Sequence, residues 1–166
     1  GKKSILFIMT DDTKNCDDVA EYIRGNSHDL KDAVLTIHTN KSGEISESIT
    51  GKSKEELDIL RKQANEIDSL ESPFKVIVSV LMLKEGWDVA NIYTIAPIRS
   101  SAAQILTEQT IGRGLRLPYG ERTGNKNVDR VMIVAHDNYA RVVEEAKYSK
   151  LIQPSNIESI STDDTK

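Results

Sequence analysis

The chain lacks several features that would assign it to a common protein class. A single cysteine, Cys16, among 166 residues excludes an internal disulfide and a zinc site built from several thiolates. Aromatic residues make up only 5% of the chain, and no apolar run approaches the roughly 18 residues of a membrane span. The basic start Gly1-Lys2-Lys3 is not followed by a signal-peptide cleavage pattern. We therefore expect one globular domain that is soluble and cytoplasmic, with no membrane contact.

An excess of positive charge is also missing. The 22 basic and 26 acidic side chains give a net charge of −4 at pH 7. A free-standing, sequence-independent nucleic-acid binder usually presents a dominant basic surface, so any grip on phosphate must come from a few placed side chains. The histidines, His28, His38 and His136, have no second ligand at metal-binding spacing, and we expect no metal site.

Short apolar runs alternate along the chain with amphipathic segments. The runs at residues 4–9, 33–38, 75–80, 92–96 and 131–135 have the length of buried strands. Thr13 or Asn15 can cap a helix with apolar Cys16, Val19, Ala20 and Ile23, and helices are also predicted over 55–70, from 101 into an arginine motif, and over 139–148. This alternation predicts an α/β fold in which helices cover both faces of a parallel sheet.

The carboxyl ends of parallel strands meet at one edge of a sheet, where ligands usually bind. Hydroxyls, backbone N–H groups and Lys41 in the loops after the first two strands are suited to phosphate contacts. Arg99 could serve nucleic acid or a surface ion pair. The first loop and the helix start hold four acidic residues, Asp11, Asp12, Asp17 and Asp18. A capping role for these acids is as plausible as binding of a nucleic-acid strand. The candidate nucleic-acid residues are Thr10, Thr13, His38, Thr39, Lys41 and Arg99.

One amide and two arginines recur at spacings of four and three residues in Gln109-Thr110-Ile111-Gly112-Arg113-Gly114-Leu115-Arg116. On a helix, Arg113 and Arg116 lie roughly 40° and 20° either side of Gln109 and share its face. Guanidinium groups bind phosphate oxygens through a planar fork of donors, and the glycines allow another surface to approach closely. The spacing indicates a grip on a polyphosphate, with an ordinary solvated helix face as the alternative.

A second motif, Leu83-Lys84-Glu85-Gly86-Trp87-Asp88-Val89, follows the third predicted strand. Together the two motifs resemble motifs V and VI of superfamily 2 helicases, and they are most similar to the helicase part of type III restriction enzyme Res subunits. The resemblance covers residues 3–147. It implies a RecA-like sheet of about five to seven strands, the P-loop NTPase-type C-terminal lobe of a helicase, over residues 1–150, with a polar C-terminal tail over 151–166. Many superfamily members carry Thr-Asp at the end of the third strand, where this chain has Val80-Leu81.

The resemblance also implies roles for the motif residues. Arg113 and Arg116 would act as arginine fingers on ATP, with Gln109 ordering the same phosphates. Glu85, Gly86, Asp88 and Gly112 would lie beside the nucleotide, although a structural turn at Gly86 and Asp88 is the alternative. The phosphate loop and acidic pair that hold ATP with Mg²⁺ are not in this sequence, so we expect the nucleotide to be held mainly by an N-terminal RecA-like lobe.

Gly1 in place of Met suggests a part excised from a longer protein. We therefore expect the C-terminal motor lobe of an ATP-dependent DNA translocase or helicase, inactive alone, whose complete form acts on double-stranded DNA with a methyltransferase subunit and a nuclease domain. Two alternatives stay open. The lobe could belong to another superfamily 2 RNA or DNA helicase or repair motor, or it could be a non-catalytic RecA-like regulatory module.

Overall fold

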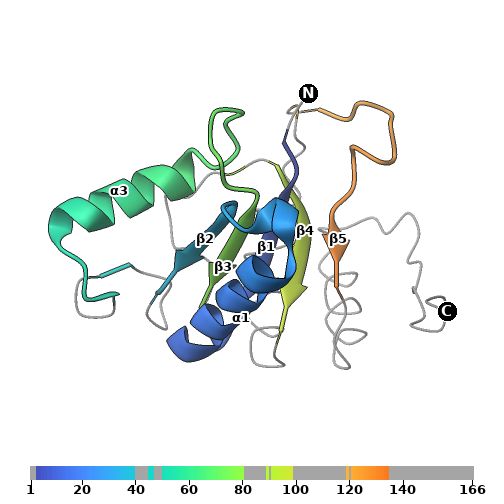
Figure 1. The fold of residues 1–166 in the computed structure, drawn as a ribbon. Coiled ribbons are helices and arrows are strands. Elements are labelled where there is room, and N and C mark those ends of the chain that lie inside the picture. The colour runs from blue at the N-terminus through green and yellow to red at the C-terminus, as the bar shows by residue number, and fades with distance from the viewer. Residues whose placement is uncertain are drawn as a thin grey trace, which may run out of the picture.

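Five parallel strands form one sheet in the order β2-β3-β1-β4-β5 (Figure 1). The structure is a computed structural model that describes residues 3–39, 45–46, 50–80, 89, 91–98, 119 and 121–134. The predicted parallel sheet, with a strand count between five and seven, is confirmed over these residues. The strands are β1 (Ile5–Met9), β2 (Val34–Ile37), β3 (Val76–Ser79), β4 (Ile92–Pro97) and β5 (Met132–Ile133).

Each predicted strand is present, and the differences lie at the ends. The last strand is shorter than expected, because only Met132 and Ile133 pair with β4. Pro97, expected to stop the fourth strand, is instead its final residue and lies opposite Met9 of β1. Proline has no N–H to donate, but the N–H of the next residue, Ile98, donates to the Met9 carbonyl at 3.0 Å. The hydrogen bonds between β1 and the chain after β4 therefore continue past Pro97.

Helix α1 (Thr13–Asn26) follows β1, and Cys16 and Ala20 are buried as their spacing predicts. The expectation that Thr13 or Asn15 caps this helix is wrong: the cap is Asp12, whose carboxylate accepts the Asn15 N–H at 2.7 Å. The Asn15 side chain donates instead, to Asp11 and Asp12, both at 2.8 Å. A carboxylate at this position also complements the positive end of the helix dipole.

Helix α3 (Lys54–Asn65) begins at a capping box, in which the Ser53 hydroxyl and the Glu56 carboxylate accept each other's backbone N–H. It ends at Asn65 rather than near residue 70, and turns follow it. The short 3₁₀ helix His28–Leu30 (η1) was not expected. The helices predicted over 101–116 and 139–148 lie outside the described residues. The predicted apolar stripe of the second helix is nevertheless buried throughout: Leu57, Leu60, Ala64 and Ile67.

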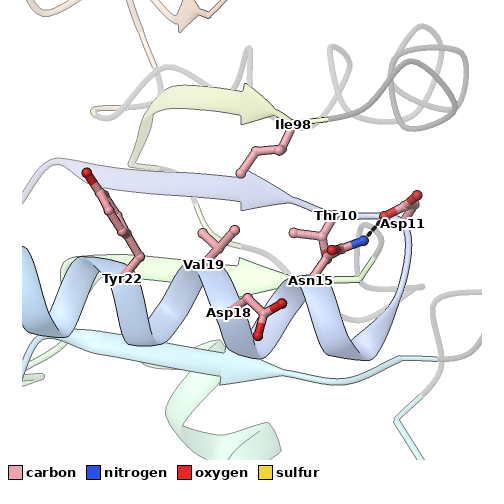
Figure 2. A pocket seen from close by; sticks show the side chains of 7 residues that line it. All are labelled: Thr10, Asp11, Asn15, Asp18, Val19, Tyr22 and Ile98. Carbon is pink, nitrogen blue, oxygen red and sulfur yellow. Dashed lines mark hydrogen bonds between the residues drawn. The ribbon is translucent and has the colours of Figure 1, made fainter.

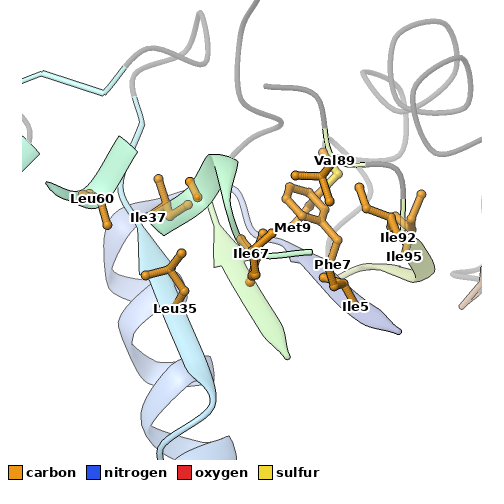
Figure 3. Close-up of a cluster of buried hydrophobic side chains, with 12 residues drawn as sticks. Ile5, Phe7, Met9, Leu35, Ile37, Leu60, Ile67, Val89, Ile92 and Ile95 are labelled. Atoms are coloured by element: carbon orange, nitrogen blue, oxygen red, sulfur yellow. The ribbon is translucent and has the colours of Figure 1, made fainter. Parts of the chain in front are cut away.

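The two helices cover opposite faces of the sheet. The chain runs outward from β1 to β2 through α1 and back to β3 through α3, and right-handed crossovers in opposite directions place the helices on opposite faces. Side chains alternate along each strand, so the core divides into two clusters. Cys16 and Ala20 of α1 pack with Ile8, Val34, Val76, Val78 and Val80. Figure 3 shows the other cluster, in which Leu60, Ala64 and Ile67 meet Ile5, Phe7, Met9, Leu35, Ile37 and Ile77, with Val89, Ile92 and Ile95 beside them.

Candidate functional site

The carboxyl ends of the strands meet at one edge of the sheet, and four of the predicted nucleic-acid residues are described there. Thr10 follows β1, Thr13 opens α1, and His38 and Thr39 follow β2. Val80 ends the third run as a buried apolar side chain in the α1-side cluster. The edge that the sequence indicates is therefore assembled from the loops after β1, β2 and β3.

Thr10 links the ends of two neighbouring strands. Its N–H donates to the Ser79 carbonyl at 2.9 Å, and its hydroxyl lies 3.2 Å from the Asp12 carbonyl and 3.3 Å from that of Ser79. Only 1% of the residue is exposed. Because a hydroxyl has one proton to donate, the two carbonyls share that donor. Thr10 therefore links the ends of β1 and β3 to the residue that caps α1. Its contact with nucleic acid stays a prediction.

His38 and Thr39 have very different surroundings. The His38 Nε2 atom lies 2.8 Å from a carboxylate oxygen of Asp17 on α1. Thr39 is 3% exposed, and its hydroxyl has no hydrogen-bond partner in the part of the chain that the structure describes. A buried hydroxyl without a partner costs stability, which is a frequent mark of a functional position.

Most residues of the two sequence motifs lie outside the described part of the chain. Lys41, Arg99, Glu85, Gly86 and Asp88 lie outside the described residues, as do Gln109, Gly112, Arg113 and Arg116. Their roles stay predictions, as do the domain limits 1–150 and 151–166. Among the described residues, no three His, Cys, Asp or Glu side chains group so that they could hold a metal ion, and no helix is long and apolar enough to cross a membrane.

A groove of about 340 Å³ runs along α1 on the side that faces β4 (Figure 2). Val19 and Tyr22 of α1 and Ile98, which follows β4, supply its apolar surface, while Asp11, Asn15 and Asp18 supply its polar groups. The sequence did not predict this groove. The only signal was Tyr22, three residues after Val19, which belongs to the predicted apolar stripe of α1 but is only partly buried.

The fold can be compared with known proteins, although no family model matches the chain. Among solved structures it resembles the C-terminal domain of Dbp5 from S. cerevisiae, bound to Gle1 and IP6, with a TM-score of 0.53 at 16% identity over 91% of this chain and 72% of that one. The chain has the fold of a helicase RecA-like C-terminal domain, as the motifs implied.

Among curated proteins, the chain is similar to Res subunits of type III restriction-modification enzymes. It is 32% identical over 117 residues to the EcoPI subunit of Escherichia phage P1, covering 61% of this chain and 12% of that protein. It is 45% identical over 53 residues to the EcoP15I subunit of Escherichia coli, covering 32% and 6%, and 45% identical over 47 residues to the StyLTI subunit of Salmonella typhimurium, covering 28% and 5%. The resemblance to Res subunits is confirmed, and the chain spans 12% or less of the length of these relatives.

Proposed function

We propose that the chain is the C-terminal motor lobe of an ATP-dependent DNA translocase or helicase of the type III Res kind, acting in the cytoplasm. The observation that carries the proposal is the parallel RecA-like sheet together with similarity to Res subunits. In this proposal the lobe faces an N-terminal RecA-like lobe across ATP with Mg²⁺. The complete protein moves on double-stranded DNA and works with a methyltransferase subunit that recognises the site.

The nucleotide contacts come from the two motifs. Arg113 and Arg116 stabilise the charge that builds up on the γ-phosphate during transfer, and Gln109 orders the same phosphates. Gly86 and Gly112 let the backbone approach the nucleotide, while Glu85 and Asp88 accept hydrogen bonds from it. The similarity to Res subunits and the helicase fold support a helicase lobe, and the spacing of the motif residues supports these roles within it.

Removing the fingers tests this part of the proposal. In the intact motor protein that contains this chain, Arg113→Ala and Arg116→Ala should each lower DNA-stimulated ATP turnover by roughly a thousandfold, measured as phosphate release. Arg122→Ala is the matched control, because Arg122 is an exposed arginine outside the motifs, and it should leave turnover unchanged. Unchanged turnover in both finger variants would establish the non-catalytic regulatory module instead. Stimulation by RNA alone would establish another superfamily 2 motor.

The nucleic-acid contacts come from the loops after β1 and β2. Thr39 carries this part of the proposal, because its hydroxyl lies at the carboxyl edge, next to His38, with no partner among the described residues. Because Thr39 is only 3% exposed, a phosphate oxygen has to displace the atoms that cover this hydroxyl to give it the acceptor it lacks. Lys41, Arg99, Thr10, Thr13 and His38 are the other contacts in the proposal.

Thr39→Val separates a binding role from a structural one. Valine has the shape of threonine without its hydroxyl, so removing an unpaired buried group should leave stability unchanged or raise it by up to about 1 kcal/mol. DNA affinity of the intact protein should nevertheless fall several-fold, measured by fluorescence anisotropy at fixed salt. Thr50→Val is the control for loss of a threonine hydroxyl that already has a partner, because the Thr50 hydroxyl donates to the Ser46 carbonyl at 2.9 Å. Equal DNA affinity for Thr39→Val and the parent would remove Thr39 from the contact set.

A further inference from the structure

The groove beside α1 combines an apolar surface with negative charge. Figure 2 shows Val19 and Tyr22 rising from α1 toward the strands, and Ile98 reaching down from the end of β4. Tyr22 is 69% exposed and Ile98 42% exposed, which is high for large apolar side chains that line one groove. The volume of about 340 Å³ is enough to enclose one long side chain of a partner.

The polar lining of the groove combines two carboxylates with the neutral side chains of Thr10 and Asn15. Asp11 and Asp18 line it, and no lysine or arginine does so among the described residues. Asp11 accepts a hydrogen bond from the Asn15 side chain at 2.8 Å. Asp18 makes no hydrogen bond or ion pair with another described residue, so its carboxylate is open to a ligand. Asp12, which caps the helix, and Asp17 in the second turn add negative charge to α1, while Lys14 in its first turn is positive.

We propose that this groove docks a basic segment of a partner polypeptide, by inserting an arginine or lysine side chain beside Asp18. The aliphatic part of such a side chain covers Val19 and Ile98, as long cationic side chains do on apolar surfaces. Its charged head then lies between the Asp18 carboxylate and the Tyr22 ring, which favour a cation by ion pairing and by a cation–π contact. Charge complementarity identifies the partner as a basic polypeptide.

The same charges disfavour nucleic acid in this groove. A phosphate chain would approach the Asp18 carboxylate, and none of the described lining residues is a lysine or arginine, so like charges in partly buried surroundings would repel. The groove also lies on the opposite side of α1 from the His38–Asp17 contact. The docking proposal therefore stands apart from the proposed nucleic-acid contacts at His38 and Thr39, whereas Thr10 lines the groove and cannot serve both roles at once.

Binding of a defined peptide tests the proposal on the full chain. The probe is a fluorescein-labelled peptide of alternating arginine and leucine, followed by anisotropy at physiological salt. Asp18→Asn should weaken binding about fivefold, and Tyr22→Ala about five- to tenfold. Circular dichroism checks that both variants are folded. In amide NMR spectra, the shifts caused by the peptide should gather on residues 15–22 and at Ile98.

Two control variants separate docking from general attraction to an acidic protein. Glu21→Gln removes an exposed carboxylate of the same helix outside the groove, and Ile59→Ala removes an exposed apolar side chain of α3. Both should change affinity less than twofold. Equal losses in Glu21→Gln and Asp18→Asn, or no peptide binding by the parent chain, would overturn the proposal. It would also be overturned if oligothymidylate displaced the peptide and bound more tightly to Asp18→Asn.

Discussion

The two sides of α1 differ in how the helix meets the sheet. On the β2 side its polar side chains are bonded to the strand: Arg24 donates to the Val34 carbonyl at 3.0 Å and to the Thr36 hydroxyl at 2.9 Å, and Asp17 contacts His38. On the β4 side Asp18 and Tyr22 border an open groove instead. One helix thus closes one half of the sheet and leaves a binding surface over the other.

The largest expected effect concerns the reactivity of Cys16, which is fully buried beneath the β2 side of α1, called here the closed side. Burial, with a further contribution from the Asp17 charge, raises the pKa of its thiol from 9.0 to about 12. At pH 8 the thiolate should therefore be roughly a thousandfold rarer than in the unfolded chain. We expect negligible labelling by iodoacetamide in the folded protein and rapid labelling in urea, measured by mass spectrometry. Rapid labelling without urea would show that the closed side opens.

The same shift predicts a pH dependence. Above pH 9 the unfolded thiol loses its proton while the folded thiol keeps it, so the unfolded state binds fewer protons and stability falls with rising pH. The contribution is present in full below about pH 9 and is lost toward pH 12. Urea unfolding across this range should show a smaller alkaline loss in Cys16→Ala than in the parent.

A pair of matched valines tests the packing on the two sides. Val34 of β2 is 5% exposed beneath α1, and Val34→Ala should lower the free energy of unfolding by about 2 kcal/mol because it leaves a cavity. Val19 borders the groove, and Val19→Ala should cost under about 1 kcal/mol because solvent can fill the space. Urea unfolding gives both values. Equal losses would mean that the groove side is packed as tightly as the β2 side.

The smallest expected effect concerns β2, the outermost strand on one side of the sheet. β2 is an edge strand, and Arg24 covers one of its outward carbonyls. Arg24→Ala should cost about 1 kcal/mol through its lost hydrogen bonds and should promote self-association through the bared edge. Urea unfolding and sedimentation velocity measure the two effects. Lys14→Ala, an exposed cation on the same helix, should change neither.

Apolar periodicity predicted most of the core. Cys16 and Ala20 on α1 and the stripe from Leu57 to Ile67 are all buried, because a helix that lies against a sheet has to bury one stripe. Helix ends were predicted less well. Asp12 caps α1 although Thr13 and Asn15 have equally suitable side chains, and the choice depends on where the strand before it releases the chain.

The groove and the unpaired hydroxyl of Thr39 could not be predicted, because both depend on which strands are neighbours. Ile98 and Val19 line one groove only because β4 pairs with β1, although more than eighty residues separate these strands in the sequence. Alternation of strands and helices indicates a parallel sheet but not its order. The carboxyl edge was predictable because every parallel order brings the strand ends together.

The central position of β1 has a consequence for folding. β1 precedes the other described strands in the sequence, yet it pairs with β3 and β4 and not with β2, the next described strand along the chain. The backbone of β1 stays unpaired until the ribosome has produced the two strands that flank it. Such long-range pairing slows folding and leaves aggregation-prone apolar surface exposed in the nascent chain. We expect that β1 cannot be paired on both sides until Ile92–Pro97 has emerged, so chaperone binding to nascent chains should begin to fall only beyond that chain length.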